Sequence, residues 1–496
     1  MGDMDFIVNT EYGAVKGKMD NESVCFLGVP YGKAPTGNLR FKRAVPCDKW
    51  EDVLDCTYKR AVSPQHDLKK GETMTEDCLY MNIWSPKADN KKRPVLFYMH
   101  GGSFVTGSPN EEGINGAKLA KSLDIVIVSV SFRLGVLGFL DFTFLGDEFE
   151  ANCGLTDAVE ALKWVNINIE FFGGDPDNVT ISGQSSGASM AVALNCVEEA
   201  YPYFHKTYSL SAGPVLMVNQ SQYVKTAQNY LRFMHIKNKE ELFTLSAEHL
   251  VSKQREFARA AKLGAGAFTI DIDGKVMKAQ PIPAAVEGIT CNKPIYLSTT
   301  REEMSFLFIK PLAKALDVDD LTEVGVSQET EENKVLIGDL YKKIYKRRAL
   351  PVQYSDMIFR MGNVWFAEAQ SKNAPVWLGR FDYSSPFMTF IKLYAFHSVD
   401  LSFIFANYNK DLSRAVFAFS PFKITAKKIT AVMQKNLKDF MTTGKMDWEQ
   451  ASEKSFPAMC WSKKSKVEQC MPPELVKAYS RTAFRHRSFT GDAIKL

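Results

Sequence analysis

The sequence lacks the apolar segments that insert a chain into a membrane or export it. Its longest apolar run, IVIVSVSF at residues 125–132, is about a third of the length that spans a bilayer and is typical of a buried strand. The N-terminus, MGDMDFIVNTEYG, contains acidic residues and no apolar core of a signal peptide. We therefore expect a protein without a membrane span that stays in the cytoplasm.

Strong charge patches and closely paired cysteines are also scarce. The formal net charge is +4 and no basic run is interleaved with aromatic residues, so we do not expect a nucleic-acid partner. The basic stretch at residues 481–487 is short and is interpreted as a solvated helix end. The nine cysteines form no CxxC pair and no metal-type spacing, and their odd number favours free thiols in a reducing compartment.

The composition that remains is that of a well-packed globular protein. Hydrophobic residues make up 45% of the chain and charged residues 24%, with no low-complexity tract. No linker rich in Pro, Gly and Ser divides the 496 residues. Because large α/β sheets exceed the usual size of a domain, we expect a single domain over residues 1–496.

Buried strands alternate with helical patterns from Pro94 onward, which predicts an α/β fold with a mostly parallel sheet and helices on both faces. Apolar residues between Leu155 and Ile169 recur at spacings of 3, 4, 3 and 4 and predict a helix that Gly173 and Gly174 terminate. Polar helical segments at 225–258 and 322–345 indicate insertions over the sheet. The predicted strands cover residues 95–99, 125–132, 179–182, 294–298 and 375–381.

The stretch ISGQSSGAS at residues 181–189 raises the possibility of a nucleophile. A predicted strand runs into GQSSG, and a helix of small residues follows. Glycines at 183 and 187 flank Ser185 on both sides, which allows a sharp turn that projects the serine hydroxyl above the sheet edge. Taken alone, the motif also fits an ordinary loop rich in glycine and serine.

A serine nucleophile needs a base and an acid, which in this type of fold follow it in the order acid, then base. His397 lies after the predicted strand at 375–381, whereas His486 lies in the basic tail. Glu302 and Glu303 follow the strand at 294–298 and supply candidate acids. The loop HGGSF at residues 100–104 follows the first strong strand, where donors for an oxyanion are expected.

At this point the chain resembles the type-B carboxylesterases and cholinesterases, members of the α/β-hydrolase fold, over nearly its whole length. The blocks that carry the resemblance are FLGVPYGKAPTGNLRFKR from Phe26, EDCLYMNIWSP from Glu76, MHGGSF from Met99, FRLGVLGF from Phe132, NCGLTDAVEALKWVNINIEFFGGDPDNVTISGQSSGAS from Asn152, TTREEMSF from Thr299 and AFHSVDLSFIF from Ala395.

The resemblance implies a carboxylic-ester hydrolase that acts on a small-molecule ester and needs no metal or organic cofactor. It assigns Ser185 as nucleophile, Glu303 as acid and His397 as base. It also assigns the oxyanion donors to the backbone N–H groups of Gly102, Ser103 and Ser186.

The resemblance further implies two buried structural ion pairs, Arg133 with Asp175 and Arg40 with Glu76. The chain departs from the family at Gln184, where a glutamate is common, and we expect this change to tune activity without abolishing it.

Other departures concern substrate range and cysteines. Ser103 replaces a family glycine in the oxyanion loop, adds a side chain beside the acyl group and is expected to narrow the pocket. Met304 replaces a second family glycine, the one after the acid. Cys78 matches half of a family disulfide, but Ser63 occupies the partner position, so we expect this bond to be absent, with Cys56 as an alternative partner to test. The loop at residues 67–75 has no aromatic residue, which argues against a specialist for choline esters.

Two alternatives stay open. A catalytically silent member of the fold could serve as a scaffold or adhesion protein, although such relatives typically lose the nucleophile. An amide or carbamate hydrolase would use the same triad, and sequence alone does not separate it from an esterase. The residues give no oligomeric state.

Overall fold

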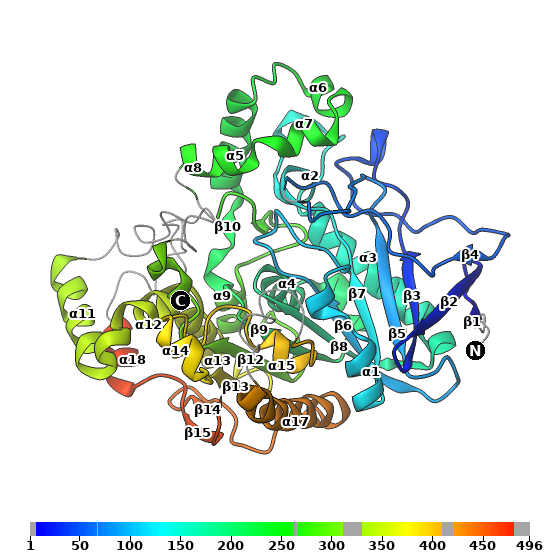
Figure 1. Ribbon diagram of the computed structural model, residues 1–496. Helices are drawn as coiled ribbons and strands as arrows, with labels where there is room; N and C mark the ends of the chain where they lie inside the picture. The colour runs from blue at the N-terminus through cyan, green and yellow to red at the C-terminus, as the bar shows by residue number, and fades with distance from the viewer. Residues whose placement is uncertain are drawn as a thin grey trace.

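The computed structural model describes residues 6–66, 68–261, 263, 266–310, 330–408 and 420–480. A 13-stranded sheet forms the centre, in the order β1-β2-β3-β5-β7-β6-β8-β9-β12-β13-β14-β15, with β4 beside β2 (Figure 1). The strands are β1 Phe6–Asn9, β2 Ala14–Asp20, β3 Ser23–Pro30, β4 Leu54–Asp55, β5 Tyr80–Ser85, β6 Arg93–Met99, β7 Val126–Val130, β8 Gly174–Gln184, β9 Lys206–Leu210, β12 Ile295–Thr300, β13 Val376–Phe381, β14 Pro457–Trp461 and β15 Lys466–Gln469, and a separate pair joins β10 Val218–Asn219 to β11 Asp271–Ile272.

The middle of the sheet, from β7 to β14, is parallel, and antiparallel strands flank it on both sides. The register sets Met99 at the end of β6 opposite Gly183 near the end of β8. The carboxyl ends of the parallel strands therefore meet at one edge of the sheet, where α/β folds place their sites.

Both faces of the sheet are buried, as a parallel sheet requires. Side chains of β6 alternate between two apolar clusters: Val95 and Phe97 pack in the cluster that includes α3, whereas Leu96 and Tyr98 pack in the cluster that includes α1 and α17. This alternation explains why the central strands are continuous hydrophobic runs with no polar face.

The predicted α/β elements are present, with shifted bounds. The helix predicted from the 155–169 spacing is α3, Cys153–Asn168, followed by a 3-10 turn at Ile169–Phe172 and by Gly173 at a φ of 80°. The strand predicted at 179–182 is longer, Gly174–Gln184, because pairing with β6 starts at Gly174 across an irregularity. The strand predicted at 125–132 is shorter, Val126–Val130.

The chain between β9 and β12 is mostly helical, as predicted for residues 225–258, and α5–α8 project above the sheet in Figure 1. The α-helices that the structure describes with bounds are α1 Ala117–Leu123, α2 Gly135–Phe139, α3 Cys153–Asn168, α4 Ser186–Leu194, α5 Gln220–Phe233, α6 Lys239–Thr244, α7 Ala247–Ser252, α8 Gln254–Ala260, α9 Pro281–Val286, α11 Glu331–Tyr345, α12 Ala349–Ser355, α13 Met361–Gln370, α14 Pro386–Phe390, α15 Leu401–Ile404, α17 Ser420–Thr443 and α18 Pro473–Tyr479.

Several sequence predictions concern residues outside this description, namely the basic stretch 481–487 with His486 and the first part of the segment 322–345. Among the described residues, no helix is both long and apolar enough to cross a membrane. All nine cysteines are buried free thiols, and burial raises the pKa of Cys78 to about 12. Cys56 and Cys78 are thus not joined.

Candidate active site

The turn between β8 and α4 holds Ser185 in a strained backbone conformation. Its φ of 58° and ψ of −121° lie in a region that side chains rarely occupy. A Cβ on Gly183 would lie 2.3 Å from the carbonyl carbon of Gly187, and a Cβ on Gly187 would lie 2.1 Å from the carbonyl oxygen of Met99. Both flanking glycines are therefore required, because strand and helix nearly touch, and Ser185 stands at the carboxyl edge of the sheet.

Glu303 follows β12 and is fully buried. One carboxylate oxygen, Oε1, accepts hydrogen bonds from Ser211 Oγ at 2.6 Å and from the Thr300 N–H at 2.6 Å. Burial alone would raise the pKa of Glu303, but the facing His397 and these hydrogen bonds together hold that pKa below its ordinary value. Glu303 is therefore an ionised carboxylate despite its burial.

His397 lies on the loop between α14 and α15, against the other oxygen of Glu303. Its Nδ1 is 2.6 Å from Glu303 Oε2, and its backbone N–H donates to the Glu303 carbonyl at 3.0 Å. The ring of Phe359 stacks on the imidazole with centroids 4.9 Å apart. An ionised carboxylate only accepts, so Nδ1 carries the proton and Nε2 presents a lone pair.

The lone pair of His397 Nε2 faces the residue before the serine. That residue is Gln184, and its amide nitrogen lies 3.0 Å from His397 Nε2. The Ser185 hydroxyl makes no hydrogen bond to another described residue. Ser185, His397 and Glu303 are thus brought to one edge, with the base aligned by the acid and its free nitrogen engaged by a neutral amide.

The loop after β6 borders the serine. A Cβ on Gly101 would lie 3.3 Å from Ser185 Cβ, and one on Gly102 would lie 2.0 Å from the Thr106 carbonyl oxygen. Gly102 and Ser103 have φ values of 120° and 55°. Within the described chain, the N–H groups of these two residues and of Ser186, the first residue of α4, donate to no protein acceptor. Three unengaged donors beside a serine suit a developing oxyanion.

Some supporting residues had no signal in the sequence reasoning. Gln65 fixes the loop after β6, accepting from the Gly107 N–H at 2.9 Å and donating to the Gly107 carbonyl at 3.0 Å. Ser211 follows β9 with a φ of 61°, and a serine directly after a buried strand is the only pattern that could have indicated it. Phe359 lies in a π-helical turn, Asp356–Arg360, a deviation that often accompanies functional sites.

The two adjacent glutamates have different partners: Glu303 contacts His397, whereas Glu302 contacts two arginines. Glu302 is fully buried and contacts Arg301 at 2.9 Å and Arg348 at 2.7 Å. Its other oxygen accepts from the Ala395 N–H at 3.2 Å. Neither glutamate is a solvated helix start, because each carboxylate has its own set of donors.

One of the two expected ion pairs is confirmed and the other is wrong. Arg40 binds Glu76 through two hydrogen bonds of 2.8 and 2.6 Å. Arg133 does not pair with Asp175. Its guanidinium instead contacts Asp157 on α3 at 2.5 Å, and its backbone N–H donates to the same carboxylate.

The strand topology explains this correction. Arg133 follows the carboxyl end of β7, whereas Asp175 stands at the start of β8, and both strands run parallel to β6. The two residues therefore lie at opposite edges of the sheet. Asp175 accepts a hydrogen bond from the Asp177 N–H at 3.1 Å.

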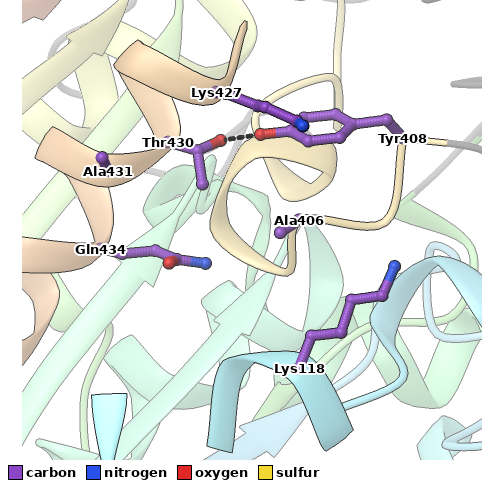
Figure 2. Close-up of a pocket in the computed structure, with 7 residues that line it drawn as sticks. All are labelled: Lys118, Ala406, Tyr408, Lys427, Thr430, Ala431 and Gln434. Atoms are coloured by element: carbon purple, nitrogen blue, oxygen red, sulfur yellow. Dashed lines mark hydrogen bonds between the residues drawn. The ribbon is translucent and has the colours of Figure 1, made fainter. Parts of the chain in front are cut away.

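A pocket of about 550 Å³ lies between α1, the loop after α15 and α17 (Figure 2). It contains none of the proposed catalytic residues and offers ammonium, hydroxyl and amide groups without a nucleophile and base in contact. Its lining residues are Lys118, Ala406, Tyr408, Lys427, Thr430, Ala431 and Gln434.

Solved structures of carboxylesterases have a similar fold. A carboxylesterase of Geobacillus stearothermophilus superposes with a TM-score of 0.83 at 30% identity, over 95% of this chain and 99% of that one. A thermophilic para-nitrobenzyl esterase matches equally, with a TM-score of 0.83. The predicted α/β-hydrolase fold is confirmed.

The sequence comparisons agree. The para-nitrobenzyl esterase of Bacillus subtilis is 34% identical over 414 residues, which are 81% of this chain and 83% of that protein. A cholinesterase of Mus musculus is 36% identical over 217 residues, 40% of this chain and 36% of that protein. A sequence model of the carboxylesterase family matches residues 4–478 of this chain. The chain therefore belongs to the carboxylesterase family and is a carboxylesterase, a serine hydrolase of carboxylic esters.

Proposed function

We propose that Ser185, His397 and Glu303 are the catalytic triad with which this carboxylesterase cleaves small to medium apolar esters through an acyl-enzyme. The observation that carries the proposal is the 2.6 Å contact between His397 Nδ1 and the buried Glu303 carboxylate at the edge where the strained Ser185 stands. A serine hydroxyl becomes a nucleophile only when a base in a fixed tautomer takes its proton.

In the first half of the reaction, Ser185 Oγ attacks the ester carbonyl while its proton passes to His397 Nε2. The carbonyl oxygen gains negative charge, which the N–H groups of Gly102, Ser103 and Ser186 stabilise. Glu303 stabilises the imidazolium that forms. The tetrahedral intermediate collapses as Nε2 gives its proton to the departing alcohol.

In the second half, water replaces the alcohol. His397 takes a proton from the water as it attacks the acyl-serine, the same N–H groups stabilise the second oxyanion, and the carboxylic acid leaves with Ser185 restored. Side chains and backbone amides of this chain account for each proton transfer and charge, and the proposal uses no metal or organic cofactor.

The preference for apolar esters rests on a small cluster beside the triad. Met304, Ile358 and Phe359 form an apolar group separate from the main cores, with Phe306 and Leu307 packed against it. Met304 adjoins Glu303, and Phe359 stacks on His397. Apolar side chains next to the acid and the base support a preference for substrates with an apolar acyl or alcohol group.

The test is hydrolysis of a p-nitrophenyl acyl series, from acetate to longer chains, by the wild type and by Ser185→Ala, His397→Ala and the double variant. Each single change should lower kcat on the order of 10⁶-fold, and the double change little further, because the residues act as a unit. If Ser185→Ala kept the wild-type rate, the nucleophile assignment would be wrong. The profile of rate against chain length measures the size of the pocket.

An amide or carbamate hydrolase with the same triad is tested in the same assay. Matched ester and anilide substrates share the acyl group and differ in the leaving group. The amine of the anilide is harder to expel than the phenol of the ester. We expect the ester to be cleaved faster. Faster turnover of the anilide would assign the chain to amide hydrolysis with the same residues.

A further inference from the structure

Gln184, the last residue of β8, occupies a position from which it acts on the base. The residue is 4% exposed, and its amide nitrogen lies 3.0 Å from His397 Nε2. Because Glu303 fixes the proton of the neutral ring on Nδ1, Nε2 can only accept. The Gln184 amide therefore donates to the same lone pair that must take the serine proton.

The amide is held between two parts of the site. A Cβ placed on Gly101 would lie 2.6 Å from Gln184 Oε1, so the absence of a side chain at Gly101 makes the room in which the amide sits. The Gln184 side chain thus places its oxygen beside Gly101 and its nitrogen against the base.

The charges around His397 are few and can be named. Glu303 faces it from the loop after β12. Asp400, three residues after His397, is 1% exposed, and its Oδ1 has no hydrogen-bond partner. Burial and the nearby charge of Glu303 raise the pKa of Asp400 to about 7. Phe359 covers one face of the ring without charge. Glu302 is neutralised by Arg301 and Arg348.

We propose that Gln184 is a positioning residue of this esterase: its amide holds the imidazole of His397 in the resting enzyme, yields Nε2 to the Ser185 hydroxyl when an ester binds, and adds no negative charge beside the imidazolium. This inference rests on the proposed function. A carboxylate at the same place would stabilise the protonated ring, so the base would be lost at a higher pH.

The experiment compares Gln184→Glu, which is isosteric and charged, with Gln184→Met, which is similar in length and neutral. The readout is kcat/KM for p-nitrophenyl acetate from pH 5 to 9, followed at the isosbestic wavelength of the phenol. For Gln184→Glu we expect the acidic limb to move up by about one pH unit, a roughly tenfold loss below the limb, with the plateau within a few-fold of wild type. For Gln184→Met, which removes the hydrogen bond to the neutral ring, we expect a smaller upward shift of the limb than for Gln184→Glu and a several-fold lower kcat.

A matched control makes the same amide-to-carboxylate change away from the triad. Gln434 on α17 is 8% exposed and lines the pocket of Figure 2, and Gln434→Glu should leave the acidic limb in place. The proposal is overturned if Gln184→Glu follows the wild-type profile, or if both Gln184 variants lose equal fractions of activity at every pH. If Gln184→Glu fails to fold by circular dichroism, an unchanged kcat in Gln184→Met overturns it.

The same assay separates this failure from failure of the proposed function. If wild type turns over and Ser185→Ala does not, the triad stands and only the role of Gln184 is in question. If Ser185→Ala is as active as wild type, the triad itself is wrong, whatever the Gln184 variants do.

Discussion

At the scale of single residues, the two adjacent glutamates after β12 have opposite partners. Glu303 faces the imidazole and Glu302 faces two arginines. Their near identity in sequence makes them a matched pair for testing which carboxylate orients the base.

We expect Glu303→Gln to lower kcat/KM roughly 10⁴-fold, because an amide no longer holds the required tautomer or stabilises the imidazolium. Glu302→Gln should keep activity close to wild type wherever the protein stays folded, because its carboxylate contacts no reacting group. Steady-state kinetics with p-nitrophenyl acetate measure both. The reverse ranking would assign the acid to Glu302.

A buried ion pair is the second residue-scale feature, and the correction from Asp175 to Asp157 makes it testable. Asp157→Asn leaves the buried Arg133 guanidinium without a counter-charge and should lower the free energy of unfolding by about 3–5 kcal/mol. Asp175→Asn should change it by less than about 0.5 kcal/mol. Urea denaturation of the two variants measures the difference, and equal effects would contradict the pairing.

At the scale of elements, the contact between β8 and α4 determines where the serine stands. Gly187→Ala adds a Cβ that would lie 2.1 Å from the Met99 carbonyl oxygen, and the backbone must move to relieve the clash. We expect a loss of about 1–3 kcal/mol in unfolding free energy together with a large loss of activity.

The control for this prediction is another helical glycine. A Cβ on Gly338 in α11 would meet no atom within 4 Å, so Gly338→Ala should stabilise the protein by about 0.5–1 kcal/mol with activity unchanged. Denaturant midpoints and kcat/KM are measured on both variants. A Gly187→Ala enzyme with wild-type activity would show that the turn does not need its glycine.

The elements that sequence predicts well are those with local causes. The spacing from Leu155 to Ile169 defines α3, and glycines around Ser185 indicate the turn, because periodicity and backbone freedom act over a few residues. Arg133 pairs with Asp157 and His397 stacks on Phe359, and both contacts depend on how distant segments pack in the folded chain. Asp157 and Phe359 therefore could not be predicted from spacing. The resemblance gave Asp175 as the partner of Arg133, where the structure has Asp157.

At the scale of the whole molecule, buried carboxyls couple stability to pH. Asp271 is fully buried, and burial, together with the charge of the neighbouring Asp141 and a hydrogen bond to it, raises the pKa of Asp271 to about 9. The folded protein therefore keeps a proton that the unfolded chain releases near pH 4.

The sign of the effect follows from linkage. Between about pH 4 and pH 9 the native state binds the additional proton, so the stability that Asp271 contributes is present at low pH and falls by about 1.4 kcal/mol per unit as pH rises. We expect Asp271→Asn to flatten the decline in unfolding free energy over this range. Urea denaturation of wild type and variant at several pH values checks it, and parallel curves would contradict it.

The strand order described above also has a kinetic consequence. His397 and Glu303 are 94 residues apart in the chain, and Gln184 and His397 are 213 apart, so their contacts form only after distant parallel strands have docked. Closing such long loops is slow, whereas α3 and α17 can form locally. During refolding from urea, helical circular dichroism should return before hydrolysis of p-nitrophenyl acetate. Ester cleavage then reports the last stage of folding, when the native topology is complete.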